Sequence, residues 1–501
     1  MTKNKIAVYA ALICAVFFTL LFHRQDLGLN ILLIETVFLT WLFISKSIDF
    51  RIKNNLIFGA GVLLTASAVI LVYSPYVITI NIISVFLFVG VLIYPQAKSA
   101  LNSLLLAFCN IPASQSSFFL SLSHKDDGKP KKRKIVIFFI PVIIIIFFLI
   151  IYSNSSPYFS NLLENVGTFL NDNLFFVFKN VDALAIFTYL VGLAISNFIF
   201  FRKPTPEIIA DDKKASDELI RFKTKKIVPS KFKLSALKDE YKASIFLLLI
   251  INILLFVVNL LDVYWVWFNF SWNGLYLKQF VHEGTYLLLL SIVCSIIIVL
   301  YFFRGNLNFY SKNKFLRQLS LIWLMQNAVL TVSVAIRNMH YINYFALAYK
   351  RIGLMLFLLL TLYGLYTVYV KVSKKKSSFY LFRTNILAIY VVLVLSSLVN
   401  WENIIAKYNF SHYKTSFAEL DYLSRFPNKS VPYLIKSTEE LTEINTVQKG
   451  LFPFEKDYMK PEAYEKVMNA RKQMFIREWE SRSVLSWNWP EYKAYKELKD
   501  N

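Results

Sequence analysis

The sequence lacks the short motifs that mark the common enzyme and metal-binding classes. Its three cysteines, Cys14, Cys109 and Cys294, lie in apolar stretches with no close pair, so we predict buried thiols and neither a disulfide nor a metal site. The dipeptide His282-Glu283 begins like a zinc-protease motif, but no second histidine follows at the His-Glu-x-x-His spacing. No phosphate-binding glycine loop and no nucleophile elbow occur. The sequence therefore names no catalytic residue, and we expect no cofactor.

Apolar residues are abundant instead. They make up 56% of the 501 residues, above the share of about 45–50% that is usual for soluble proteins. Several apolar runs have the length of about 20 residues that an α-helix needs to cross a membrane. The formal net charge of +23 would suggest nucleic acid in a soluble protein, but here the basic residues gather in short loops between apolar runs. That pattern reflects membrane topology, and we expect no nucleic-acid partner.

The apolar runs predict an all-α fold, a polytopic bundle of about eleven transmembrane helices followed by a C-terminal extramembrane helical segment. We place the spans at about 6–22, 29–45, 56–73, 77–95, 135–152, 183–201, 243–261, 285–303, 318–336, 352–370 and 384–400. Residues 101–123 are apolar at first but contain a polar run that begins at Pro112. We interpret them as an interfacial or re-entrant segment.

Lysine and arginine are unevenly divided between alternate loops, and this asymmetry predicts the orientation because basic residues resist translocation. The basic loops, which we expect in the cytoplasm, are 46–53, 125–134, 202–242, 304–317 and 371–383. No cleavage site follows the first apolar run, so we expect it to stay as a signal anchor. The N-terminus is then cytoplasmic and the C-terminus extracytoplasmic.

These features divide the chain into four parts: a six-span half (1–201), a basic cytoplasmic linker (202–242), a five-span half (243–400) and an extracytoplasmic tail (401–501). The linker is either a solvated connection that favours anionic lipids or a regulatory docking site.

In the tail, Pro461 opens a helical pattern. Its apolar face contains Tyr464, Val467, Met468, Phe475 and Trp479. That face needs a partner, so the tail forms either a small helical domain or a layer on the membrane surface.

Ionisable residues within or beside spans are costly in lipid and are therefore candidates for function. Glu35 lies inside the second span, where it is either protonated or bonded to a neighbouring helix, or else functional. The other candidates stand at the outer ends of later spans, and they are His282, Glu283, Arg337, Lys350 and Arg351.

Three basic residues in one short outside loop contradict the charge rule, so something must offset their cost. One explanation is pairing with Glu35, Glu283, Asp26 or Asp262. A second is an anionic ligand such as a lipid phosphate, which arginine binds through paired hydrogen bonds. A third is a different local topology.

Several ordered polar motifs between residues 180 and 425 carry a family resemblance. They include Glu283-Gly284-Thr285, Arg304-Gly305-Asn306, Tyr349-Lys350-Arg351-Ile352-Gly353 and Asn400-Trp401. With these motifs the chain resembles a bacterial membrane family known as domain of unknown function 4173, related to 4153. The resemblance implies a polytopic architecture and a bacterial inner-membrane location. It implies no activity.

Two functions fit these observations. The first is a non-enzymatic sensing or transport protein whose outer polar cluster (Glu35, His282, Glu283, Arg337, Lys350 and Arg351) binds an anionic or lipid-like ligand. The second is a cell-envelope transferase for lipid-linked glycosyl or acyl groups, with Asp26 as an outside base. In both cases we expect membrane lipids as partners.

Overall fold

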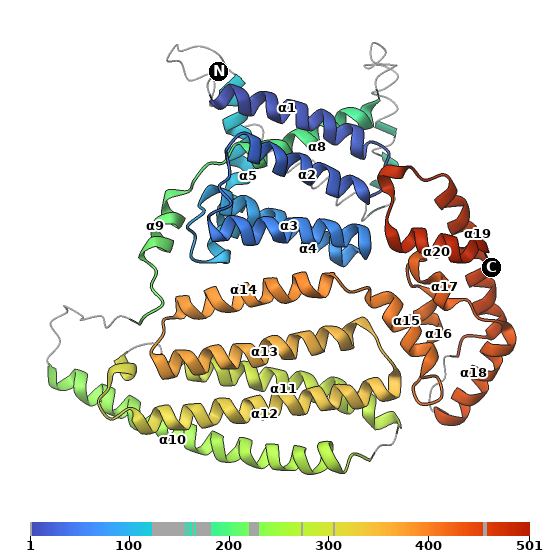
Figure 1. Cartoon of the computed structure of the whole chain (residues 1–501). Helices are drawn as coiled ribbons and strands as arrows, with labels where there is room; N and C mark the ends of the chain where they lie inside the picture. Colours follow the sequence, from blue (N-terminus) through green and yellow to red (C-terminus); the bar gives the residue numbers. More distant parts are fainter. Residues whose placement is uncertain are drawn as a thin grey trace.

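The fold is all-α. The computed structural model describes residues 3–122, 156, 158–159, 161–162, 165–166, 182–219, 230–271, 274–303, 306–453 and 458–500. These residues form helices and a single isolated β-bridge between Glu218 and Lys376, with no strand among them. Figure 1 shows two stacked sets of roughly parallel helices, with a helical tail against one end of both.

The N-terminal half contains α1 (Lys3–Phe22), α2 (Leu29–Ile44), α3 (Lys53–Leu71), α4 (Pro75–Ile93) and α8 (Ala183–Phe200). The closest neighbours are α1 with α8 and α3 with α4. Their buried side chains form a continuous apolar core that includes Phe38, Leu42, Phe58, Leu87 and Phe88. Because the residues on the opposite faces are also apolar and exposed, these helices present an apolar surface outward, as membrane helices do.

The C-terminal half contains α10 (Ser230–Asp262), η2 (Val263–Phe268), α11 (Gly274–Phe302), η3 (Asn306–Phe309), α12 (Lys314–Phe345), α13 (Tyr349–Lys374) and α14 (Ser378–Ser397). Helix α12 is central, since it contacts α10, α11 and α13. Its 32 residues correspond to a length of about 48 Å at about 1.5 Å per residue. It therefore extends beyond a hydrocarbon core about 30 Å thick.

Helix α14 joins the two halves. It packs on α13, and its Tyr390 and Val394 also belong to the core of the N-terminal half. The Tyr390 hydroxyl donates to Ser84 Oγ at 3.2 Å, and Tyr76 Oη lies 2.6 Å from Ser396 Oγ. A Cβ atom at Gly61 would meet the Tyr390 hydroxyl, so a larger residue here would require the Tyr390 side chain to shift.

The loops of the bundle separate into two ends, which we call the linker-side end and the tail-side end. At the linker-side end, on the left of Figure 1, Arg202 Nη1 donates to Ser47 O at 3.2 Å and Tyr241 donates to Lys312 O at 2.7 Å. The described basic loops thus meet at one end, as their predicted common side requires. Which side of the membrane this end faces stays a prediction.

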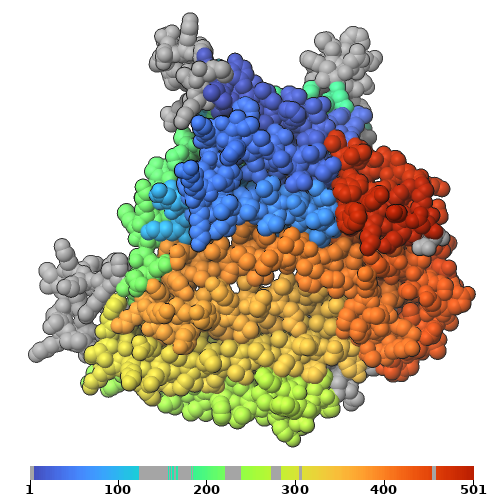
Figure 2. Space-filling view, in the orientation of Figure 1, coloured from blue at the N-terminus to red at the C-terminus, as the bar shows by residue number. Residues whose placement is uncertain are grey.

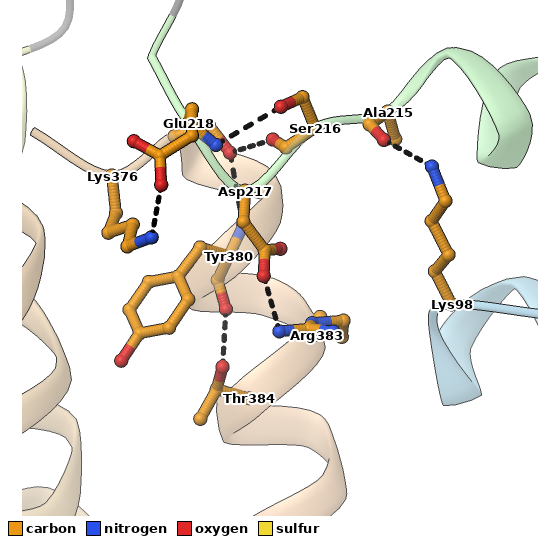
Figure 3. A network of polar contacts seen from close by, with 10 residues as sticks. Lys98, Ala215, Ser216, Asp217, Glu218, Lys376, Tyr380, Arg383 and Thr384 are labelled. Carbon is orange, nitrogen blue, oxygen red and sulfur yellow. Dashed lines mark hydrogen bonds and ion pairs between the residues drawn. The ribbon is translucent and has the colours of Figure 1, made fainter.

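The structure describes the first part of the linker as far as residue 219, and this part contains α9 (Pro206–Lys214). Figure 3 shows how this segment bridges the halves: Lys98 donates to Ala215 O at 2.6 Å, and Arg383 pairs with Asp217 at 2.5 Å. The buried Asp212 accepts from the Lys98 amide at 2.9 Å. Because of these contacts, this part is a fixed connection and not a merely solvated one.

The segment expected to be interfacial or re-entrant is one continuous helix, α5 (Ala100–Leu122). Its start, middle and end all contact the linker-side end: Asn102 donates to Asp212, Asn110 donates to Phe198 O, and Ser121 lines a cavity with Ile6. The polar run of α5 hydrogen-bonds to α8, since Gln115 Nε2 donates to Ala194 O at 2.9 Å. The helix therefore crosses this end of the bundle.

Nine helices of the described residues are long and apolar enough to cross a membrane, and α2 and α8 are shorter apolar helices. The chain is therefore a multi-pass membrane protein. The nine include α5 by length and composition. The expected span at 135–152 lies outside the described residues, so the count of eleven stays a prediction.

Three helices extend well beyond their predicted spans. Helix α12 continues to Phe345, beyond the expected end at 336, α11 begins at Gly274, before the expected start at 285, and α10 begins at Ser230, before the expected start at 243. Hydropathy falls where a helix leaves the lipid, but the backbone hydrogen bonds continue. Arg337 and the pair His282-Glu283 consequently lie within helices and not at their ends.

The tail folds as a small helical domain. Its elements are α15 (Trp401–Ser411), α16 (Leu420–Ser424), η4 (Asn428–Ser430), α17 (Val431–Leu434), α18 (Thr438–Leu451), α19 (Pro461–Glu480), η5 (Val484–Ser486) and α20 (Trp489–Asp500). The predicted start at Pro461 is confirmed, and Tyr464, Met468 and Phe475 are buried in the tail core. Val467 is exposed instead, so its assignment to that face was wrong.

The tail contacts both halves, as Figure 2 shows on the right of the molecule. Lys429 Nζ donates to the carbonyls of Val72 (2.7 Å) and Tyr73 (2.9 Å) at the end of α3, and it pairs with Glu402 at 2.9 Å. Burial lowers the pKa of Lys429, while Glu402 acts in the opposite direction. Lys429 is therefore a buried clamp between tail and bundle.

Candidate functional site

Arg337 forms a buried ion pair at the tail-side end. Its guanidinium donates to Asp262 Oδ1, and Ser333 Oγ donates to Asp262 Oδ2 at 2.6 Å. Arg337 and Asp262 are only 6% and 8% exposed. Asp262 ends α10, one of the helices that packs on α12, so this packing brings the two charges together. The structure thus offsets the cost of Arg337 by pairing it with one of the four acids named above.

A cavity of about 620 Å³ lies next to this pair, and we call it the tail-side cavity. Helix α11 contributes Thr285, Tyr286 and Leu289, and α12 contributes Asn338 and Tyr341. The segment that begins α13 supplies the remaining lining residues, which are Ala348, Lys350, Arg351, Gly353, Leu354 and Phe357. The two cations come from the first turn of α13, and apolar side chains come from the following turns of α11 and α13.

Arg351 is fixed at the rim of this cavity. It donates to the carbonyl oxygens of Phe345 and Ala346, and its guanidinium carbon lies 4.5 Å from the centre of the Tyr341 ring. Ala346 has a positive φ of 61°, which marks the tight turn between α12 and α13. Arg351 therefore has two tasks, since it closes this turn and adds positive charge to the cavity.

Lys350 is different, because its side chain is exposed. Among the described residues it makes no hydrogen bond or ion pair. The neighbouring wall is also open, since Tyr286 and Phe357 are 64% and 46% exposed. A free ammonium group beside exposed apolar side chains suits a ligand that has an anionic head and an apolar body.

His282 and Glu283 lie on α11, but their side chains fall outside the described residues. The next residue, Gly284, has the position of its missing Cβ 3.6 Å from Arg337 Nη1. The backbone of α11 therefore passes beside the Arg337 ion pair, and the two predicted residues stand one turn or less from it.

The structure does not bring Glu35 to this cavity. Glu35 is buried in the N-terminal half, where it hydrogen-bonds to Asn81 and lines a small apolar cavity with Phe38 and Val62. Its Oε2 atom has no hydrogen-bond partner in the described structure. The predicted six-residue cluster is therefore not one site, because hydropathy cannot give the order of helices around a bundle.

Asn338 and Tyr341 line the cavity but were not predicted from the sequence. Asn338 Nδ2 donates to Arg351 O at 3.0 Å, which holds the first turn of α13 against α12. Tyr341 follows Arg337 by four residues and therefore lies on the same face of α12, which was the available signal; Asn338 is the next residue in the chain after Arg337. That signal required knowing that α12 continues past 336.

Asp26 lies at a second cavity, between the N-terminal half and the tail. This polar cavity of about 620 Å³ is lined by Arg24, Asp26, Glu478 and Arg482, together with neighbouring residues. Asp26 lies 3.8 Å from Arg482 and is largely exposed. Two carboxyl groups thus face one solvent-accessible cavity.

One family model matches the chain, namely "Domain of unknown function (DUF4153)", over residues 31–437. No curated protein and no solved structure shows significant similarity. The match begins in α2 and ends in the tail, so it is wider than the resemblance seen between residues 180 and 425. The link to family 4173 and to bacteria stays a prediction. The chain belongs to the DUF4153 family.

Proposed function

We propose that this member of the DUF4153 family is a non-enzymatic membrane protein, for sensing or transport, that binds an anionic, lipid-like ligand in the tail-side cavity. One observation carries the proposal. Lys350 and Arg351 line the same cavity as the exposed apolar side chains of Tyr286 and Phe357.

The charges of the neighbourhood support an anionic ligand. Asp262 already has Arg337 as its partner, so this carboxylate is not available to Lys350. Arg351 donates to neutral carbonyl oxygens and forms no ion pair among the described residues, although the Glu419 carboxylate acts on its charge from farther away. A phosphate or carboxylate beside Lys350 and Arg351 would contact both cations and form charge-assisted hydrogen bonds with them.

The apolar wall supports a lipid-like body. Leu289, Leu354 and Phe357 lie further along α11 and α13, away from the two cations. Both helices are long and apolar enough to cross a membrane. An acyl chain along this wall would bury apolar surface, at about 25 cal/mol per Å².

The proposal includes a topology. The tail-side end is extracytoplasmic and the linker-side end cytoplasmic, with eleven spans in an inner membrane and the four-part division of the chain given above. The gathering of the basic loops at the linker-side end supports this orientation. The ligand head then lies at the outer leaflet.

Photo-crosslinking tests the proposal. Phosphatidylglycerol with a photoreactive acyl chain, in phosphatidylcholine vesicles, should label α11 and α13 of the full chain. In the Lys350→Ala variant, labelling should fall about fivefold, since one surface lysine is worth about 1 kcal/mol toward an anionic lipid. Lys466→Ala, an exposed lysine on the tail, is the matched control. Equal labelling by a phosphatidylcholine probe would contradict an anionic ligand.

A transferase is the second candidate, and the polar cavity at Asp26 favours it because Glu478 lies in the same cavity. Such a pair could supply a general base and a general acid. Cells that carry only Asp26→Asn should then have altered surface glycans or lipids. Unchanged glycans and lipids would remove this candidate.

A further inference from the structure

A cavity of about 770 Å³ opens at the linker-side end, away from the tail-side cavity, and we call it the linker-side cavity. It lies where the start of α1, the end of α2, the end of α8 and the transverse helix α5 meet. Its lining residues are Ile6, Ala7, Trp41, Ser45, Lys46, Ser47, Ser117, Ser121, Phe200, Phe201, Arg202 and Lys203. None of them is acidic, although three carry positive charge.

Two other basic residues of this end are paired with carboxylates of the linker. Arg383 pairs with Asp217, and Lys376 pairs with Glu218 (Figure 3). In contrast, Lys46, Arg202 and Lys203 form no ion pair with a described carboxylate. Their mutual repulsion is therefore not offset by the protein groups that the structure describes.

Arg202 is positioned by the backbone around it. Its Nη1 donates to Ser47 O at 3.2 Å and lies 3.5 Å from Leu92 O, which places the guanidinium beside the turn that ends α2. Guanidinium has five N–H donors, so other donors are available to a ligand. In the same turn, Lys46 has a left-handed backbone with φ 51°, and its side chain is exposed.

The remaining lining matches a polar head at a membrane boundary. The Ser45 and Ser47 hydroxyls are hydrogen-bonded to each other at 2.9 Å, and both serines line the cavity. Trp41, Phe200 and Ile6 form the apolar side of the cavity. Tryptophan is common at the membrane interface, where an apolar body and a polar edge are both satisfied.

We propose that the linker-side cavity, through Lys46, Arg202 and Lys203, binds a phosphate-bearing anion. The source of the phosphate is either an anionic phospholipid headgroup or a soluble phosphate. Basic pockets between membrane helices bind such headgroups by charge and hydrogen bonding. This site is independent of the tail-side cavity.

Native mass spectrometry of the purified full chain tests the site, with phosphatidylglycerol as the probe and phosphatidylcholine as the uncharged reference. All proteins carry Lys350→Ala, which weakens the tail-side cavity. Adding Lys46→Asn and Lys203→Gln should reduce phosphatidylglycerol binding at least tenfold. Asparagine tolerates the left-handed backbone at position 46, and neither side chain holds a neighbouring element, so folding should be unaffected.

The matched control is Lys374→Gln, an exposed lysine at the same end but outside the cavity. Arg202→Gln should weaken binding as well. If inorganic phosphate displaces the lipid from the parent protein, the phosphate source is soluble; if only the lipid binds, it is a headgroup. Both results support the site. Unchanged binding in the double variant, or an equal loss in Lys374→Gln, would overturn it.

Discussion

Arg337 and Lys350 lie at the same end of neighbouring helices, yet the protein treats them in opposite ways. Arg337 is buried, and its charge is paired with Asp262. Lys350 is exposed at the rim of a cavity whose other walls are largely apolar. The same anomaly in the sequence, basic residues at the unexpected end of a span, thus has two physical solutions. The first solution stabilises the fold, and the second provides a place for a ligand.

The largest loss of stability should come from breaking the buried ion pair between Arg337 and Asp262. Asp262→Asn removes one partner and leaves Arg337 as an uncompensated buried charge. We expect a loss of about 3–5 kcal/mol in the free energy of unfolding. Thermal unfolding in detergent, together with the amount of protein in the membrane fraction, measures this loss.

The double variant Asp262→Asn/Arg337→Gln provides the control. Because it removes both charges, it should be more stable than either single variant. A double variant whose loss equals the sum of the single losses would show that the two side chains do not interact.

Replacing Lys429, the clamp between tail and bundle, should cause the next largest loss of stability. Lys429→Met keeps the side-chain volume but removes the partner of Glu402 and the donor to the carbonyls of Val72 and Tyr73. The expected loss is about 3 kcal/mol, at the lower end for a buried pair, because the Tyr349 hydroxyl still hydrogen-bonds to Glu402.

Limited proteolysis distinguishes the clamp from a general defect. The tail of Lys429→Met should be cleaved from an intact bundle. Cleavage throughout the bundle at the same rate would show that Lys429 supports the whole fold.

The ion pair between Lys499 and Glu480 on the surface of the tail should contribute much less to stability. Hydrogen bonds from Lys499 and Tyr495 lower the pKa of Glu480 below its ordinary value of 4.5. Its contribution is therefore present above about that pH and is lost as the pH falls through the lower folded value. Glu480→Gln should lower the melting temperature slightly at neutral pH. The difference from wild type should disappear in acid, and a constant difference would contradict this assignment.

Lys350→Ala should have the smallest effect on stability. The side chain is exposed, and substitutions at such sites usually change the free energy of unfolding by less than about 0.5 kcal/mol. Chemical denaturation of wild type and variant measures the difference. A loss comparable to that of Asp262→Asn would make Lys350 a structural residue and would end the contrast with Arg337.

The membrane architecture could be predicted from the sequence because apolar runs of sufficient length have few other uses. The ends of α11 and α12 could not, since hydropathy marks the edge of the lipid and not the end of a helix. The same limit explains the two missed residues of the cavity, Asn338 and Tyr341, which lie in the extension of α12.

Pairings across the fold were the least predictable. Asp262 was one of four acids considered for the basic cluster, but only the packing of α10 on α12 selects it. Glu35 met the same chemical criteria and lies in the other half. Lys429 contacts the end of α3, which is far away in the chain. No pattern in either segment predicts this contact.

The most direct test of the central claim is the melting temperature of the purified chain with and without phosphatidylglycerol. Wild type, Lys350→Ala and the matched control Lys466→Ala would be compared, with phosphatidylcholine as the uncharged lipid. We expect phosphatidylglycerol to raise the melting temperature of wild type and control, and the rise to be largely lost in Lys350→Ala while its melting temperature without lipid is unchanged. An equal rise in all three proteins would contradict a ligand site at the tail-side cavity.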